Sequence, residues 1–364
     1  MTPLVDWSMP DRLALLSDAG QSLTYGQLRA EVVRISKLLS RKKLIFLAGR
    51  NDIPTTVTYL ACLESGCVPL LLTPDISATA FSRLLIAYTP AYVFLPTAQA
   101  ANYSDFETAL INGEYSLCRH REGVGPDLHS ELAMLLATSG STGSPKLVRL
   151  SRTNILSNAK SIVAYLGIDK NERAITSLPF NYSYGMSVLN SHLNVGASIL
   201  LTNRSLLDPL FWRLMKSSEI TSLAGVPYSY EMLLKLRFER MELPALRTLT
   251  QAGGKLSVAL IERVADGCDS KGIRFFTMYG QTEASPRMAY LQPEYLRAKI
   301  GSIGRAVPGG ALWLEDSQGN RIEKPDQIGE LVFGGPNVAF GYAFSRKDLM
   351  LGDEWQGILR TGDL

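Results

Sequence analysis

Short apolar runs alternate along the chain with segments in which apolar residues recur at helical spacing. Leu44–Ala48 is such a run and predicts a buried strand, whereas Leu28, Val32 and Ile35 predict a helix over residues 27–39. The same patterns predict helices over 55–64, 81–88, 154–166, 209–217 and 258–266, and strands over 67–72, 92–95, 197–201, 222–225, 248–251 and 274–278. Repeated strand–helix–strand units are typical of a mostly parallel sheet that helices cover on both faces, so we predict an α/β fold.

The pattern changes from Gly301 onward. Residues 311–315 and 329–333 alternate apolar and polar positions, and turns rich in Pro, Gly, Ser and Asn separate such segments. We therefore predict a small antiparallel, β-barrel-like subdomain over 301–364, after α/β subdomains over 1–130 and 131–300. The turn-rich stretch at 329–342 is interpreted as scaffold.

Composition narrows the class of protein. The 364 residues are 46% hydrophobic and 20% charged, which is typical of a globular chain with a large core and more than one lobe. The net charge of +3 is small and the Lys and Arg residues are scattered, so no nucleic-acid partner is indicated. The four cysteines have no metal-binding spacing and are expected to be reduced and buried. No apolar run approaches the roughly 20 residues of a membrane span, and no signal peptide is recognisable, so we expect a cytoplasmic protein.

The segment Thr138–Lys146 follows an apolar run at 132–137 and consists of Thr, Ser, Gly, Pro and Lys. Its glycines allow the backbone to approach a polyphosphate closely, while N–H groups, hydroxyls and Lys146 supply hydrogen-bond donors. It is not a Walker loop, because Gly-x-x-x-x-Gly-Lys-Ser/Thr is absent. The alternative is a flexible Gly/Ser connector. The alternation at 147–150 that follows is typical of a strand, which favours the phosphate-binding interpretation.

Three later segments carry polar groups next to predicted strands. Paired glycines at 253–254 let a flat ligand lie against the backbone. Tyr279, Thr282 and Glu283 come at the carboxyl end of a strand, where parallel sheets bind ligands. They suit stacking on a base, donation to a phosphate and coordination of Mg²⁺, respectively. Asp363 suits the hydroxyls of a ribose, because an ionised carboxylate only accepts hydrogen bonds. The plainer alternatives are that residues 253–254 and Asp363 lie in ordinary turns, that Tyr279 belongs to the core, and that Glu283 is a surface carboxylate.

Together these motifs resemble the adenylate-forming superfamily of AMP-forming enzymes, which includes acyl-CoA synthetases, peptide-synthetase adenylation domains and beetle luciferases. Four motifs match in family order, and earlier segments at 23–28 and 61–70 match as well. The four are Thr-Ser-Gly-Ser-Thr-Gly-Ser-Pro-Lys at 138–146, Tyr-Gly-Gln-Thr-Glu at 279–283, Gly-Glu-Leu…Gly-Tyr at 329–342 and Arg-Thr-Gly-Asp-Leu at 360–364. The resemblance implies a layered αβαβα arrangement of two mostly parallel sheets with helices. It also implies that a carboxylate attacks the α-phosphate of ATP to give an acyl-adenylate and pyrophosphate, and that the acyl group then passes to a thiol.

The resemblance also assigns roles to individual residues. Thr138, Lys146, Thr282 and Glu283 are the expected catalytic residues, with Glu283 as the Mg²⁺ ligand. The expected nucleotide-binding residues are Ser139, Gly140, Ser141, Thr142, Gly143, Ala252, Gly253, Gly254, Tyr279, Gly280 and Asp363. The implied cofactors are ATP and Mg²⁺, and CoA or phosphopantetheine is the implied thiol substrate.

The acid-binding segment departs from the family pattern. Many acyl-CoA synthetases have a histidine in a Pro-x-x-His-x-x-Gly motif, and this chain has Tyr182 in that place within 179–185. Ser183 stands where peptide-synthetase domains usually have an Asp that binds the substrate ammonium, which argues against an α-amino acid. Val226 and Tyr228 fall where the family lines its acyl pocket. We therefore predict a pocket of these four residues for a small carboxylic acid with an aryl or short acyl group.

The family continues after the Thr-Gly-Asp motif into a small, mobile C-terminal domain that carries a lysine for the reaction. This sequence stops at Leu364, so we interpret it as the large N-terminal portion of a ligase. Such a portion alone is expected to bind ATP and to adenylate poorly. An acyl carrier protein is a second acceptor that the resemblance allows, besides CoA. The alternative function is a non-catalytic relative that binds nucleotide or acyl groups, but the intact motifs favour the ligase.

Overall fold

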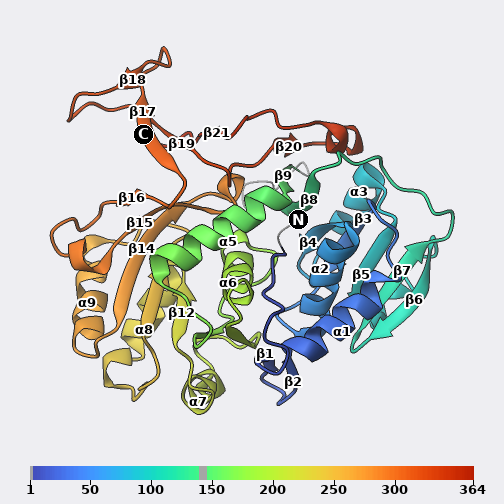
Figure 1. The fold of residues 1–364 in the computed structure, drawn as a ribbon, viewed down its shortest axis with the longest axis horizontal. Helices are drawn as coiled ribbons and strands as arrows, with labels where there is room; N and C mark the ends of the chain where they lie inside the picture. Colours follow the sequence, from blue (N-terminus) through green and yellow to red (C-terminus); the bar gives the residue numbers. More distant parts are fainter. Residues whose placement is uncertain (1–2, 139–145) are drawn as a thin grey trace.

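Two large sheets, with helices between and outside them, make up most of the computed structural model, which describes residues 3–138 and 146–364 (Figure 1). One sheet has eight strands. In spatial order they are β20 (Gly341–Ala343), β9 (Leu147–Ser151), β8 (Leu132–Ala137), β4 (Val68–Leu72), β3 (Leu44–Ala48), β5 (Tyr92–Pro96), β7 (Tyr115–His120) and β6 (Phe106–Asn112). The neighbours β8, β4, β3 and β5 pair in parallel, whereas the pairs at both ends are antiparallel, so this sheet is mixed.

The other large sheet has nine strands. In spatial order they are β16 (Arg305–Ala306), β15 (Arg287–Leu291), β14 (Arg274–Gly280), β13 (Thr248–Gln251), β12 (Ser222–Gly225), β10 (Arg173–Ile175), β11 (Ser198–Leu201), β1 (Leu13–Ser17) and β2 (Ser22–Thr24). The strands from β14 to β1 pair in parallel, and antiparallel strands flank them. Because β1 and β2 join this sheet while β8 and β9 join the other, strands from both sides of residue 130 share each large sheet.

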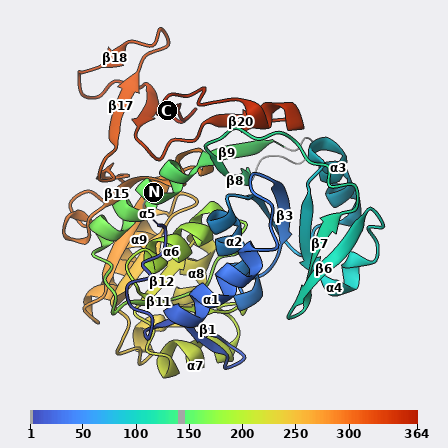
Figure 2. The same cartoon turned by 45° about the vertical axis from the view of Figure 1, so that its right-hand side comes forward.

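The last part of the chain forms a small antiparallel sheet of four strands. They are, in spatial order, β18 (Arg321–Ile322), β17 (Ala311–Glu315), β19 (Glu330–Gly334) and β21 (Ile358–Arg360). In both views β17 and β18 lie at the same end of the molecule as β20, above the two large sheets (Figures 1 and 2). An antiparallel sheet is therefore present in the predicted β-rich region, but β16 and β20 from the same region pair with the two large sheets.

Helices form the remaining layers. They are α1 (Tyr25–Ser36), α2 (Ile53–Ser65), α3 (Ala78–Tyr88), α4 (Thr97–Ala100), α5 (Arg152–Leu166), α6 (Ser183–Leu193), α7 (Pro209–Ser217), α8 (Pro227–Lys235) and α9 (Val258–Asp269), with short 3-10 turns η1 (Phe238–Arg240), η2 (Thr282–Ala284), η3 (Pro293–Tyr295) and η4 (Arg346–Met350). No helix within residues 3–138 and 146–364 has the length and apolar character that crossing a bilayer requires.

Strand β3 shows how the layers arise from the sequence. Because successive side chains of a strand point to opposite faces, Leu44 and Phe46 pack with α3, whereas Ile45 and Leu47 pack in the core that contains α1, α2, α5 and α6. On the nine-stranded sheet, Leu249 packs against the outer helices α7, α8 and α9. The order of layers is therefore helix, sheet, helix, sheet, helix, which confirms the predicted αβαβα arrangement.

Candidate active site

A cavity of about 1070 Å³ lies where the carboxyl ends of β13 and β14 meet the small four-stranded sheet. The first turn of α6, the end of β8 and the strand β20 complete its wall. Both large sheets and the small sheet thus contribute residues to one space. The carboxyl ends of parallel strands are the usual ligand-binding edge of an open α/β sheet, so this cavity is the candidate active site.

Most of the predicted site residues line this cavity, although they come from distant parts of the sequence. Those that line it are Thr138, Tyr182, Ser183, Ala252, Gly253, Gly254, Tyr279, Gly280, Thr282, Glu283 and Asp363. Ser139, Gly140, Ser141, Thr142 and Gly143 lie outside the described residues. Lys146, Val226 and Tyr228 are described but are not part of the cavity wall.

Glu283 is linked to Lys146 through an aromatic ring. The Tyr342 hydroxyl donates a hydrogen bond of 2.7 Å to Glu283 Oε1. The ammonium nitrogen of Lys146 lies 3.6 Å from the centroid of the same tyrosine ring, a cation–π contact. Burial, followed by the hydrogen bond to Glu283, raises the pKa of Tyr342 above its ordinary value. Tyr342 therefore stays neutral and keeps donating to the carboxylate.

The residues at this end of the cavity fit a magnesium ion that a polyphosphate also holds. Glu283 provides a carboxylate, which is the kind of hard oxygen ligand that Mg²⁺ prefers. No cluster of three or more His, Cys, Asp or Glu that suits a metal occurs in the described part of the chain. An ion at Glu283 would therefore take its other ligands from phosphate oxygens and water, as Mg²⁺ commonly does in nucleotide sites.

Thr282 lies against the start of helix α6. Its hydroxyl oxygen is 3.1 Å from that of Ser183, the first residue of the helix. The N-cap of the helix is Tyr182, and no described side chain caps the first turn. The first N–H groups of a helix lack intrahelical partners and carry partial positive charge. Thr282 and the α6 terminus therefore form a donor-rich corner of the cavity that suits an anion.

Asp363 is held at the cavity by β14. The Tyr279 hydroxyl donates to Asp363 Oδ2, and Gln281 Nε2 donates to the same oxygen at 3.2 Å. Burial and the contact with Asp363 raise the pKa of Tyr279, so its phenol remains a donor. The backbone carbonyl of Asp363 also accepts from Leu331 N in β19 at 2.8 Å. These contacts bring the end of the predicted ribose-binding motif beside the predicted adenine wall.

The part of the cavity wall around Tyr182 requires a glycine at position 253. Gly253 has a φ of +77°, and a Cβ at this position would lie 2.2 Å from the Tyr182 hydroxyl and 3.2 Å from Val226 Cγ1. The Tyr182 side chain therefore packs directly on the backbone at Gly253, with Val226 behind it. Tyr228 is 60% exposed on helix α8, away from this contact. Of the four residues predicted for the acid pocket, Tyr182 and Ser183 line the cavity.

Three polar residues stand out among the wall residues that the sequence motifs did not assign to the site. Gln281 is part of the quoted Tyr-Gly-Gln-Thr-Glu motif, so its position was the available signal. Tyr342 ends the stretch that was interpreted as scaffold, yet it lines the cavity and bonds Glu283. Arg287 also lines the cavity. An isolated arginine in a strand is usually a surface residue, so no local sequence pattern indicates that Arg287 is buried.

Comparison with known proteins identifies the family of the chain. The family model described as AMP-binding enzyme matches residues 7–343. Indoleacetate–CoA ligase of Aromatoleum aromaticum is 27% identical over 94% of this chain and 71% of that protein. 2-Succinylbenzoate–CoA ligase of Bacillus subtilis is 27% identical over 98% of this chain and 72% of that protein.

Solved structures share the fold. The o-succinylbenzoate CoA synthetase of Bacillus subtilis, bound with a product analogue, superposes with a TM-score of 0.80 at 23% identity, over 98% of this chain and 75% of that one. The same synthetase in complex with ATP and magnesium ion gives a TM-score of 0.77 at 23% identity, over 97% of this chain and 74% of that one. With the family model matching residues 7–343, the chain belongs to the AMP-binding enzyme family and is a ligase of the acyl-CoA synthetase type.

Proposed function

We propose that the cavity of about 1070 Å³ holds MgATP and one small carboxylic acid, and that its wall carries out the acyl-adenylation expected of the family. The assignment rests on one observation, which is that four residues far apart in sequence line the same cavity. They are Thr138, Thr282, Glu283 and Asp363. A nucleotide needs donors at its phosphates, a ligand for its metal and an acceptor at its ribose. The four residues supply these three kinds of group at different parts of one wall.

The triphosphate end of the nucleotide is assigned to Thr138, Lys146 and Glu283. Thr138 lines the cavity at the end of β8, and Lys146 lies over the Tyr342 ring that bonds Glu283. The donors predicted at 139–143 lie between these two residues in sequence and stay a prediction. Bound at Glu283, Mg²⁺ would offset phosphate charge and favour departure of pyrophosphate.

The nucleoside end is assigned to the opposite wall. Asp363 would accept from the ribose hydroxyls, because both of its described side-chain contacts fall on Oδ2. Tyr279 would flank the adenine, and the backbone at 252–254 would form the facing wall.

The chemistry requires positioning and charge stabilisation more than covalent participation by the protein. A carboxylate oxygen of the acid forms a bond with the α-phosphorus, and the bond from that phosphorus to the bridging oxygen of pyrophosphate breaks. Thr282 and the N–H groups at the start of α6 would donate to the charged oxygens during this step. The thiol sulfur then attacks the acyl carbon, its proton is released, and AMP leaves.

The acid is proposed to be small, with an aryl or short acyl group. Tyr182 packs on Gly253 beside the donor-rich corner, and Ser183 offers no charge for an ammonium group. The relatives that the comparisons name are CoA ligases, so CoA is the first acceptor to test. A phosphopantetheine on a carrier protein is the second. A cytoplasmic location stays part of the proposal, because all four cysteines are buried free thiols, as a reducing compartment would keep them.

Exchange of labelled pyrophosphate into ATP tests the proposal. The chain is incubated with MgATP and a panel of aryl and short-chain acids, and then with CoA or a phosphopantetheine-bearing carrier. Because this portion alone is expected to adenylate poorly, we expect slow exchange that depends on both an acid and Mg²⁺, followed by thioester formation with one of the two thiols. ATP binding without exchange for any acid would instead favour the non-catalytic nucleotide- or acyl-binding alternative.

A further inference from the structure

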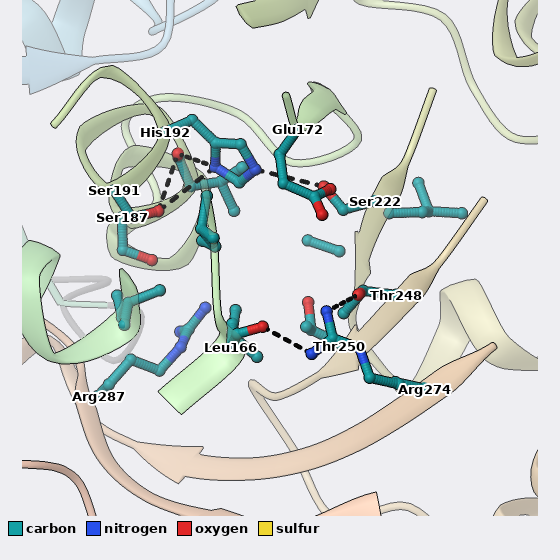
Figure 3. Close-up of a pocket in the computed structure, with 15 residues that line it drawn as sticks. Leu166, Glu172, Ser187, Ser191, His192, Ser222, Thr248, Thr250, Arg274 and Arg287 are labelled. Carbon is teal, nitrogen blue, oxygen red and sulfur yellow. Dashed lines mark hydrogen bonds between the residues drawn. The ribbon is translucent and has the colours of Figure 1, made fainter. Parts of the chain in front are cut away.

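Arg287 is a buried arginine that borders two cavities. It is the first residue of β15 and is 4% exposed. It lines the candidate active site and also a smaller cavity, to which residues of α5, α6, β12 and β13 contribute (Figure 3). In register with Gly280 on the neighbouring strand, it is close to the turn that carries Thr282 and Glu283. Arg287 thus joins the reaction site to the interior of the molecule.

The backbone and the side chain of Arg287 are both held in place. Its carbonyl oxygen accepts from Asn337 Nδ2 at 2.8 Å and from Asn158 Nδ2 at 3.3 Å. Its guanidinium lies 3.8 Å from the centroid of the Tyr184 ring. Tyr184 in turn donates to the carbonyl of Thr250 at 2.7 Å. A guanidinium fixed in this way presents its fork of donors in one orientation, which suits recognition of a carboxylate.

Within the part of the chain that the structure describes, this guanidinium has no anionic partner. Its Nε is buried without a hydrogen-bond partner, and no Asp or Glu within residues 3–138 and 146–364 forms an ion pair with it. The stacking on Tyr184 offsets part of the cost of burying the charge. A buried cation without a counter-ion is otherwise unfavourable, so an anion from the substrate would complete the site.

Other polar side chains of the smaller cavity already have partners. His192 contacts the Val188 carbonyl and the Ser222 hydroxyl, and Arg274 donates to the Leu166 carbonyl and to Thr248. Glu172 accepts from the Thr221 hydroxyl. In Figure 3, Glu172 and Arg287 lie at opposite ends of the group of lining residues. Glu172 also pairs with Arg247 at 3.8 Å, and Arg274 is bonded to protein acceptors, so Arg287 is the lining arginine whose buried Nε has no hydrogen-bond partner among the described residues.

We propose that Arg287 is a specificity-determining residue that selects an acid with a second carboxylate. The smaller cavity has a volume of about 30 Å³, room for about two water molecules and too little for a long alkyl chain. One carboxylate of the acid reacts near Thr282, and the other pairs with the guanidinium. The inference rests on the proposed function, because it places the reacting carboxylate in the same cavity.

The experiment compares diacids with their monomethyl esters in the pyrophosphate-exchange assay. Malonate, succinate, glutarate and homophthalate are each paired with the half-ester, which keeps one reacting carboxylate and loses the second charge. For at least one pair we expect the wild-type chain to prefer the diacid by about 100-fold in kcat/KM. Arg287→Met removes the charge at similar length, and Arg287→Lys keeps it without the fork. The preference should vanish in Arg287→Met and be reduced in Arg287→Lys.

The ratio between paired acids separates recognition from a structural role. If Arg287 only supported Tyr184, Arg287→Met would lower both members of a pair equally, and the inference would be wrong. A wild-type chain that uses half-esters as well as diacids would also overturn it, even if Arg287→Met does not fold. If no acid supports exchange, the proposed function fails, and calorimetric titration with the same pairs then tests the inference by itself. Tighter binding of the diacid that is lost in Arg287→Met supports the inference. Equal binding of the diacid and its half-ester rejects it.

Discussion

The hydroxyl of Tyr342 donates to Glu283 Oε1 at 2.7 Å, and this bond joins the two large sheets at the candidate active site. Tyr342 belongs to β20 of the eight-stranded sheet, while Glu283 follows β14 of the nine-stranded sheet. The Lys146 ammonium lies over the same ring. The position of the proposed metal ligand therefore depends on the packing of both sheets.

Replacing Glu283 with Gln tests its role as the metal ligand. The amide keeps the size of the side chain but removes the charge that Mg²⁺ prefers. We expect pyrophosphate exchange to fall by about 10²–10³-fold, in the range seen when a preorganised charge contact is removed. Tyr342→Phe is the matched control, because it deletes the hydrogen bond while Glu283 stays charged, and it should retain most of the activity. Unchanged exchange in Glu283→Gln would remove this residue from the proposed mechanism.

Asp363→Asn tests the ribose contact. A hydrogen bond to a charged group contributes about 1.5–3 kcal/mol, so we expect the KM for ATP to rise about 10–100-fold. Tyr279→Phe removes the hydroxyl that donates to Asp363 and should have a smaller effect. The decisive measurement compares the wild-type chain and Asp363→Asn with 2′-deoxy-ATP and with 3′-deoxy-ATP in place of ATP. If Asp363 binds the ribose, the wild-type chain should discriminate against at least one of these analogues and Asp363→Asn should not. Equal discrimination by both proteins would count against the contact.

Gly253→Ala tests whether Tyr182 depends on a bare backbone. The added Cβ would meet the Tyr182 hydroxyl at 2.2 Å, and the φ of +77° adds backbone strain of about 1–2 kcal/mol. We expect a loss of stability together with weaker use of the acid. Gly319→Ala is the control for strain alone, since Gly319 has a φ of +81° and no atom within 4 Å of an added Cβ.

Adding Tyr182→Phe to Gly253→Ala removes the clashing hydroxyl. The double variant should recover part of the kcat/KM for the acid while keeping the strain, which thermal unfolding measures separately. No recovery in the double variant would show that the Tyr182 hydroxyl is not what Gly253 accommodates.

His192 predicts a pH dependence of stability. The side chain is 4% exposed, and burial lowers its pKa from 6.5 to about 4. Below pH 6.5 the unfolded chain binds a proton that the folded chain accepts only near pH 4, so stability falls as the pH drops through this window. The contribution reaches roughly 3 kcal/mol at pH 4.

Denaturant unfolding at a series of pH values measures the effect, and His192→Gln is the control. Glutamine does not titrate, so the difference in unfolding free energy between the two proteins should change between pH 6.5 and 4 and stay constant above pH 7. A constant difference across the whole range would show that His192 does not titrate as its burial implies.

Local patterns predicted the elements well where one short stretch decides the structure. The strand Leu44–Ala48 and the helix Pro209–Ser217 occur with the predicted bounds, because apolar runs and helical spacing are properties of neighbouring residues. Other elements were missed, among them the helix α6 and the strands β1 and β2. The strands β1 and β2 have few buried residues of their own, and they form because β1 pairs with β11, far along the chain.

The candidate site likewise combines features that the sequence predicts with contacts that only the fold creates. The residue types and order of Thr138, Thr282, Glu283 and Asp363 are sequence information, and they were enough to predict nucleotide chemistry and the family. The sequence by itself therefore determined the fold class and the kind of reaction. Only the tertiary structure placed Tyr342 on Glu283, because the packing of distant strands decides that contact.

Arg287 is the strongest example of what only the tertiary structure decided. Along the chain it is one arginine in a short strand, and nothing in its neighbours indicates a buried position. The fold places it between two cavities, over Tyr184, with its carbonyl held by two asparagines. The physical reason is general: periodicity records which residues prefer burial, whereas the burial of a charge depends on which distant groups surround it.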